Sequence, residues 1–180
     1  LLRLAKNKQT WLLSLYSGLA FAPVSAFAGL WGVSFILQKY AIDRNLAAGL
    51  VSIAFVGFAF GAPFAGWLSD KVGRRKPIMM VGTFISLLAL SCIIYCPTMP
   101  YSWLAFLFWL FGLSAGFFFV SFATIREINS HELSGSSIGF INMFNALFGA
   151  LFEPLIGHFL DLGWGYQMQH GARVFSVTDY

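Results

Sequence analysis

The segment Gly66-Trp67-Leu68-Ser69-Asp70-Lys71-Val72-Gly73-Arg74-Arg75-Lys76-Pro77 is a short charged stretch between two long apolar runs. It holds four of the eleven Lys and Arg residues of the chain, at Lys71, Arg74, Arg75 and Lys76. A compact basic loop that joins two apolar helices is typical of the cytoplasmic side of a membrane protein. The segment therefore predicts a chain that crosses a membrane both before and after this loop.

The overall composition favours the same class of protein. The 180 residues are 58% hydrophobic and only 10% charged, whereas an ordinary soluble domain carries about 25% charged residues. With 21 Phe and 6 Trp, the chain has too few charges to cover a water-facing surface. The predicted fold class is an all-α, polytopic membrane protein. The net charge of +4 comes from clustered loop residues, so it indicates topology and contact with anionic lipid headgroups rather than nucleic acid.

Five apolar runs are long enough to cross the hydrocarbon core of a bilayer, which is about 30 Å thick. We expect a single transmembrane domain with helices over about 11–37, 46–68, 78–96, 103–125 and 138–162, followed by a polar extracytoplasmic tail, 163–180. Pro23 predicts a kink in the first helix, and Gly57-x-x-x-Gly61 predicts close helix approach in the second. Because five spans is an odd number and the chain begins with Leu1, we expect a fragment whose sixth span follows Tyr180.

The charges of alternate loops predict the orientation. Eight basic residues fall on one side and three on the other: Arg3, Lys6, Lys8, Lys71, Arg74, Arg75, Lys76 and Arg126 against Lys39, Arg44 and Arg173. The positive-inside rule therefore places the N-terminus in the cytoplasm and residue 180 outside. The predicted location is a plasma membrane, that is, the inner membrane of a bacterium.

The residues Gly66-x-Leu68-Ser69-Asp70-Lys71-x-Gly73-Arg74-Arg75 resemble the signature loop of the major facilitator superfamily, which joins the second and third helices of that fold. The resemblance covers the whole chain as one six-helix half without its last helix. The basic lead-in, and the lack of a buried Arg within spans three to five, favour the C-terminal half. The intact loop is more typical of the first half.

In that family the signature loop latches the two halves of the transporter together on the cytoplasmic side. The residues that carry this expectation are Gly66, Asp70, Lys71, Gly73, Arg74 and Arg75. We expect Gly66 to allow close approach of a neighbouring helix, Gly73 to allow the turn, and Asp70 to meet the positive N-terminus of another helix. The alternative is that these charges only fix the topology.

Glu153 is the candidate group for proton coupling. Apart from Asp161 at the outer end, it is the only acidic residue inside a span, and it shares a helical face with Asn142, Asn145 and Gly149. Ionisable groups within a membrane normally face a bundle interior or a water-filled cavity, where desolvation favours the protonated carboxyl. The alternative is a carboxylate that is hydrogen-bonded for packing alone.

Two further patterns bear on transport. Gly149-x-x-x-Glu153-Pro154-x-x-Gly157 resembles the Gly-Pro motif of the antiporter fifth helix, with Glu in place of the second Gly. The candidate cavity-lining residues are Ser17, Ser25, Asn142, Asn145, Ser114 and Ser121. The alternative for the serines is that they donate hydrogen bonds to backbone carbonyls of their own helices.

No pattern in the sequence predicts an enzyme, a metal site or a cofactor. The three histidines, His131, His158 and His170, lack ligand spacing, and Cys92 and Cys96 fit small apolar positions on one helix face. We expect a secondary active transporter for a small polar organic solute, of the amino acid, nucleoside or organic acid class, coupled to protons. The alternatives are a drug/proton antiporter and a non-transporting receptor or assembly module. The expected partners are the solute, the other transporter half and membrane lipid, and not nucleic acid.

Overall fold

The computed structural model describes residues 2–163, 168–169 and 172–173. Within these residues, five helical segments are long and apolar enough to cross a membrane: Lys8–Tyr40, Arg44–Val72, Arg75–Tyr95, Tyr101–Glu127 and His131–Gly163. A two-residue antiparallel pair, β1 (Met168–Gln169) with β2 (Ala172–Arg173), follows them. The predicted all-α, polytopic membrane fold is confirmed. Most of the predicted polar tail, including His170 and Tyr180, lies outside the described residues.

Three of the five crossings are built from more than one helical segment. The first follows the short α1 (Leu2–Lys6) and consists of α2 (Lys8–Pro23), the π-helix η1 (Val24–Trp31) and α3 (Gly32–Tyr40). The second and third are the single helices α4 (Arg44–Val72) and α5 (Arg75–Tyr95). The fourth consists of α6 (Tyr101–Ala115), the 3-10 helix η2 (Gly116–Phe119) and α7 (Val120–Glu127). The fifth consists of η3 (His131–Leu133) and α8 (Ser134–Gly163).

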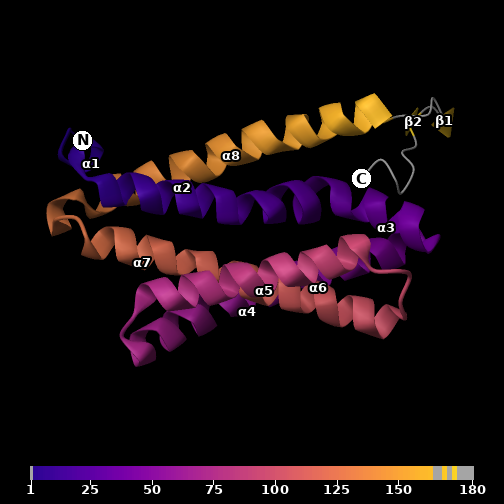
Figure 1. Cartoon of the computed structure of the whole chain (residues 1–180), viewed down its shortest axis with the longest axis horizontal. Helices are drawn as coiled ribbons and strands as arrows, with labels where there is room; N and C mark the ends of the chain where they lie inside the picture. Colours follow the sequence, from indigo (N-terminus) through magenta and orange to yellow (C-terminus); the bar gives the residue numbers. More distant parts are fainter. Residues whose placement is uncertain (1, 164–167, 170–171, 174–180) are drawn as a thin grey trace.

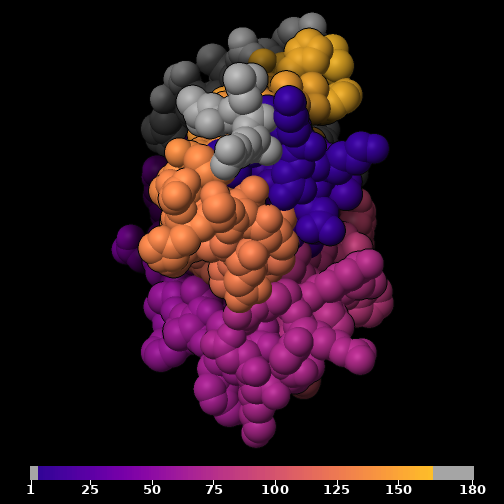
Figure 2. All heavy atoms as spheres, turned by 90° about the vertical axis from the view of Figure 1, so that its left-hand side faces the viewer, coloured from indigo at the N-terminus to yellow at the C-terminus, as the bar shows by residue number. Residues whose placement is uncertain are grey.

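The helices run roughly along one common direction, with α8 beside α2 and the α4, α5 and α6 helices on the other side of the first crossing (Figure 1). The N-terminal residues, the α4–α5 turn and the α7–α8 connection lie together at the left of Figure 1. Figure 2 looks onto this face and shows the three segments next to one another. We call it the signature-loop end.

Glycines set the distance between α4 and the fourth crossing. A Cβ added at Gly57 or Gly61 would collide with the backbone of Trp109 or Leu113. From the other side, a Cβ at Gly112 would collide with the backbone of Ala54. The close approach predicted from Gly57-x-x-x-Gly61 is therefore confirmed, and the facing helix contributes a small residue of its own.

Pro23 ends α2, the first α-helical part of the first crossing. The following eight residues, Val24–Trp31, form a π-helix instead of an α-helix. Proline lacks an N–H group and clashes with the preceding turn, and a π-helical segment is one way for a helix to absorb that disturbance. The expected kink is therefore a widened stretch of helix, and this stretch carries Ser25.

Apolar side chains fill the space between α3, α4, α5 and α6 and also cover the outside. Phe35, Phe108 and Phe111 are fully buried in the core. In contrast, Phe60 and Phe84 are 63% and 61% exposed on the outer surface. A water-facing protein rarely exposes so many large apolar side chains, so we expect lipid to cover this surface.

Candidate functional site

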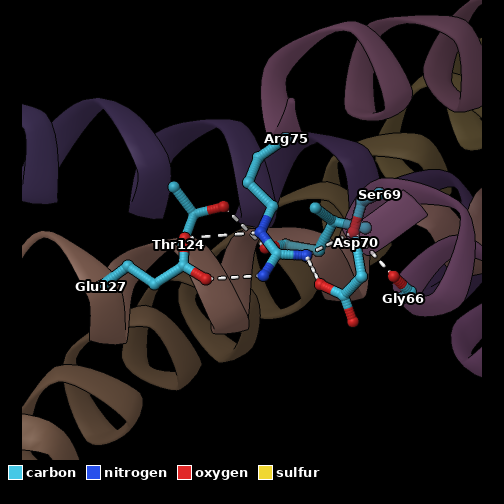
Figure 3. Close-up of polar contacts among 7 residues, drawn as sticks. Gly66, Ser69, Asp70, Arg75, Thr124 and Glu127 are labelled. Atoms are coloured by element: carbon cyan, nitrogen blue, oxygen red, sulfur yellow. Dashed lines mark hydrogen bonds and ion pairs between the residues drawn. The ribbon is translucent and has the colours of Figure 1, made fainter. Parts of the chain in front are cut away.

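Arg75 is the centre of a charged network at the signature-loop end (Figure 3). Its guanidinium group donates to Asp70 Oδ1 at 2.5 Å and to Ser69 Oγ at 2.5 Å. On the other side it donates to both carboxylate oxygens of Glu127, at 2.6 and 3.4 Å. The network thus joins the last turn of α4, the first residue of α5 and the last residue of α7.

The sharp turn between α4 and α5 puts Arg75 in this place. Gly73 adopts φ 67°, a left-handed conformation that favours glycine, and its N–H donates to the carbonyl of Ser69 at 3.0 Å. Arg74 is extended, with φ −137°, and α5 begins directly after it. As a result, the Arg75 side chain lies against the end of the preceding helix, next to Asp70.

The other residues of the predicted signature loop do not join this network. The Lys71 ammonium lies over the Trp67 ring, 5.0 Å from its centroid. Arg74 is exposed and forms no ion pair with the described residues. A Cβ added at Gly66 would meet nothing within 4 Å, so no neighbour within the described chain requires glycine there. The Gly66 carbonyl accepts a hydrogen bond from Ser69 at 2.9 Å.

Glu127 is a member of the network that the sequence analysis missed. It lies 52 residues from Arg75, in the segment between the predicted spans 103–125 and 138–162. The sequence does carry one signal for it: a carboxylate closely follows the fourth predicted span, at the side of the membrane where the signature loop also lies. Asp70 was expected to meet a helix N-terminus, and its partner in this chain is the side chain of Arg75 at the first residue of α5.

The structure brings Glu153 and Ser25 together. The Ser25 hydroxyl on η1 donates to Glu153 Oε1 on α8 at 2.5 Å. The two residues border a cavity of about 400 Å3 whose other lining residues are Phe21, Val24, Gly29, Leu30, Phe55 and Phe58. A carboxylate, a hydroxyl and aromatic rings therefore share one cavity within the apolar spans.

The other candidate cavity-lining residues occupy different places. Ser17 is fully buried and donates to Asn145 Oδ1 at 2.8 Å, so this pair joins α2 to α8 and lies away from the cavity. Asn142 is exposed, although it was expected to share a face with Asn145. Glu153 lies about three helical turns further along α8, and Asn142 does not line the cavity that Glu153 borders.

Ser114 and Ser121 bond to their own helices. Ser114 Oγ donates to the carbonyl of Leu110 at 2.6 Å, and Ser121 Oγ donates to that of Phe118 at 2.6 Å. Both are almost completely buried. Ser114 borders a second cavity between α2, α5 and α6, and Ser121 borders none of the described cavities. Both serines therefore donate to backbone carbonyls of their own helices, and Ser114 in addition borders a cavity.

A second polar feature missed in the sequence is at the opposite end of the molecule. The Lys39 ammonium on α3 donates to the carbonyls of Ile93, Ile94 and Cys96 at 2.9, 3.0 and 2.6 Å. These carbonyls end α5, where they lack partners within the helix. Lys39 therefore caps a neighbouring helix with a positive charge. Among the described residues, no group of three His, Cys, Asp or Glu side chains could hold a metal ion.

Comparisons with known proteins agree with the fold. Residues 13–168 match the family model described as Major Facilitator Superfamily. Multidrug resistance protein MdtG of Klebsiella pneumoniae is 33% identical over 172 residues, which are 94% of this chain and 39% of MdtG. The multi-drug resistance efflux pump PmrA of Streptococcus pneumoniae is 33% identical over 123 residues, 68% of this chain and 29% of PmrA.

Membrane sensor protein UhpC of Salmonella typhimurium is 29% identical over 153 residues, which are 81% of this chain and 33% of UhpC. The chain thus spans about two fifths or less of the length of these relatives. No solved structure matches it. Since the family match covers most of the five-helix fold and includes the loop that holds the Arg75 network, the chain belongs to the major facilitator superfamily of transporters.

Proposed function

We propose that the protein is a secondary active transporter that couples the movement of a small organic solute to protons. The observation that carries the proposal is the Ser25–Glu153 pair, a carboxyl group and a hydroxyl beside a cavity between membrane-spanning helices. A carboxyl group in such a place can take up and release a proton as its surroundings change between the two sides of the membrane. Alternating access would arise from rocking of this helical bundle against a second one.

Two solute classes stand as candidates. The first is a small polar solute such as an amino acid, a nucleoside or an organic acid, taken up together with protons. The second is a drug exchanged for protons, and it is supported by relatives named as a multidrug resistance protein and an efflux pump. The largely apolar and aromatic lining of the cavity also favours the second class.

We further propose that the signature-loop end faces the cytoplasm of a bacterium and gates the transporter there. The exposed basic side chains of Lys71, Arg74 and Lys76 suit the phosphates of anionic lipids on that side. The open space at Gly66 leaves room for a helix of the other half to approach. Gly66→Ala should then leave the thermal stability of this bundle unchanged but slow transport, whereas an unchanged transport rate would argue for a role in topology alone.

The main experiment is solute flux in vesicles that contain the full-length protein, with and without a proton gradient. We expect an imposed gradient to drive accumulation or extrusion, and Glu153→Gln to abolish that response. Glu132→Gln removes an exposed carboxylate outside the cavity and serves as the matched control. Flux that persists unchanged after the gradient is collapsed would refute proton coupling. Binding without any flux would favour a non-transporting receptor; one relative, UhpC, is named a membrane sensor protein.

A further inference from the structure

We infer that Glu153 and the aromatic rings beside it form a binding site for a monovalent organic cation with an apolar body. This inference rests on the proposed transport function and adds the class of the solute. The site lies between α2, η1, α4 and α8, and its lining includes Ser25, Glu153, Phe55 and Phe58. Its volume of about 400 Å3 is in the range of small-molecule sites.

The charge of the lining selects the sign of the solute. Among the described residues that line the cavity, Glu153 is the only charged one, and no Lys or Arg accompanies it. Glu153 Oε1 accepts the hydroxyl hydrogen of Ser25, while Oε2 accepts no hydrogen bond from a described residue. An unpaired carboxylate oxygen in an apolar cavity attracts a cation and repels an anion. An organic acid would therefore bind poorly while Glu153 is ionised.

The aromatic rings suit the body of such a cation. Phe21 and Phe58 are both stacked on Phe118, with ring centroids 5.4 and 5.8 Å apart, so their positions are fixed by packing. Phe55, which is 45% exposed, adds a third ring to the lining. The face of an aromatic ring attracts a cation within about 6 Å of its centroid, and its carbon surface contacts apolar groups. A neutral polar solute, by contrast, would find few hydrogen-bonding side chains beyond Ser25 and Glu153.

A single carboxylate cannot hold a proton and an ion-paired cation at the same time. Binding of the cation should therefore displace the proton, and the site would exchange one for the other. The other titratable and charged groups on the described elements around Glu153 do not line its cavity. Tyr16 on α2 bonds to Thr83, and Lys39 on α3 is bound by the carbonyls of α5. The remaining ones on the described parts of α2, α3, α4, α7, η3 and α8 do not line the cavity: Lys8, Tyr40, Arg44, Asp70, Lys71, Arg126, Glu127, His131, Glu132, His158 and Asp161.

The test uses two ions of the same shape and opposite charge, tetraphenylphosphonium and tetraphenylborate. We expect calorimetry on the purified full-length protein to show saturable binding of the phosphonium and none of the borate. Glu153→Gln should weaken phosphonium binding about tenfold or more, and Phe58→Leu by about threefold. The matched control Glu132→Gln should bind as the wild type does. Equal affinity for both ions, or wild-type affinity in Glu153→Gln, would overturn the inference.

A second measurement needs no variant and so does not depend on how a variant folds. In weakly buffered solution below neutral pH, phosphonium binding to the wild-type protein should release protons, up to one for each cation bound. Binding without proton release at any pH would contradict the exchange at Glu153. Proton-driven flux of a neutral solute without phosphonium binding would refute this inference and leave the proposed function standing. Phosphonium binding in a protein without proton-coupled flux would support the cation site and refute the proposed function.

Discussion

Arg75 at the start of α5 and Glu127 at the end of α7 are joined by two hydrogen bonds, of 2.6 and 3.4 Å, between the guanidinium group and both carboxylate oxygens. This two-point geometry is specific to arginine. The same guanidinium also holds Asp70 at the end of α4. Three of the five crossings therefore meet at one side chain, and a movement of any one of them must stretch or break part of this network.

The first prediction concerns the shape of the Arg75 side chain. Arg75→Lys keeps the charge but cannot bond to Asp70 and to both oxygens of Glu127, so it should lower the thermal unfolding temperature nearly as much as Arg75→Ala. Because Asp70 and Glu127 are 67% and 51% exposed, we expect a loss of about 1 kcal/mol or less. Arg74→Ala, at the exposed neighbouring position, should have no effect. Wild-type stability in Arg75→Lys would show that charge alone is sufficient.

The second prediction concerns the glycines between α4 and the fourth crossing. Gly112→Ala would press a methyl group against the backbone of Ala54, so it should separate the helices and cost about 1–3 kcal/mol of stability. Gly139→Ala on α8, where an added Cβ meets nothing within 4 Å, should be neutral or slightly stabilising. Thermal unfolding in detergent measures both. Equal effects of the two substitutions would mean that α4 and α6 are less tightly packed than the structure shows.

Much of the fold could be predicted because it depends on local composition. The apolar runs and the charged segment at Gly66 to Pro77 are sufficient to predict an all-α membrane fold and the family. The Gly57-x-x-x-Gly61 spacing predicts a close contact because the spacing itself brings two small residues to one face. None of these predictions requires knowledge of which helices are neighbours.

The parts that were missed depend on neighbours. Glu127 can bond to Arg75 because α7 ends beside the α4–α5 turn. The residues next to Glu127 in the sequence do not indicate that these two segments are neighbours. Asn142 and Asn145 were placed on one face at 100° per residue, but three residues advance the helix by about 300°, which turns the two side chains about 60° apart. Packing of α8 on α2 then buries Asn145 and leaves Asn142 exposed.

The third prediction concerns Lys39, whose ammonium group caps α5. Lys39→Met keeps most of the side-chain volume but leaves the carbonyls of Ile93, Ile94 and Cys96 without their donor. Hydrogen bonds to a charged group are stronger than neutral ones, so we expect a loss of about 1.5–3 kcal/mol. Thermal unfolding should show a clear decrease, and hydrogen exchange should rise in the last turn of α5. Lys71→Met, which removes only an exposed contact with Trp67, is the control.

The last prediction separates two serines of the first crossing that looked equivalent in the sequence. Ser17→Ala removes the buried donor to Asn145, so it should lower stability by about 0.6 kcal/mol, a typical value for a hydrogen bond between membrane helices, and leave solute binding unchanged. Ser25→Ala removes the donor to Glu153 beside the cavity, so it should change the pH dependence of transport more than the unfolding temperature. Both are measured by thermal unfolding and by flux across a pH series. If Ser17→Ala altered the pH dependence as much as Ser25→Ala, the α2–α8 contact would have to belong to the transport site as well.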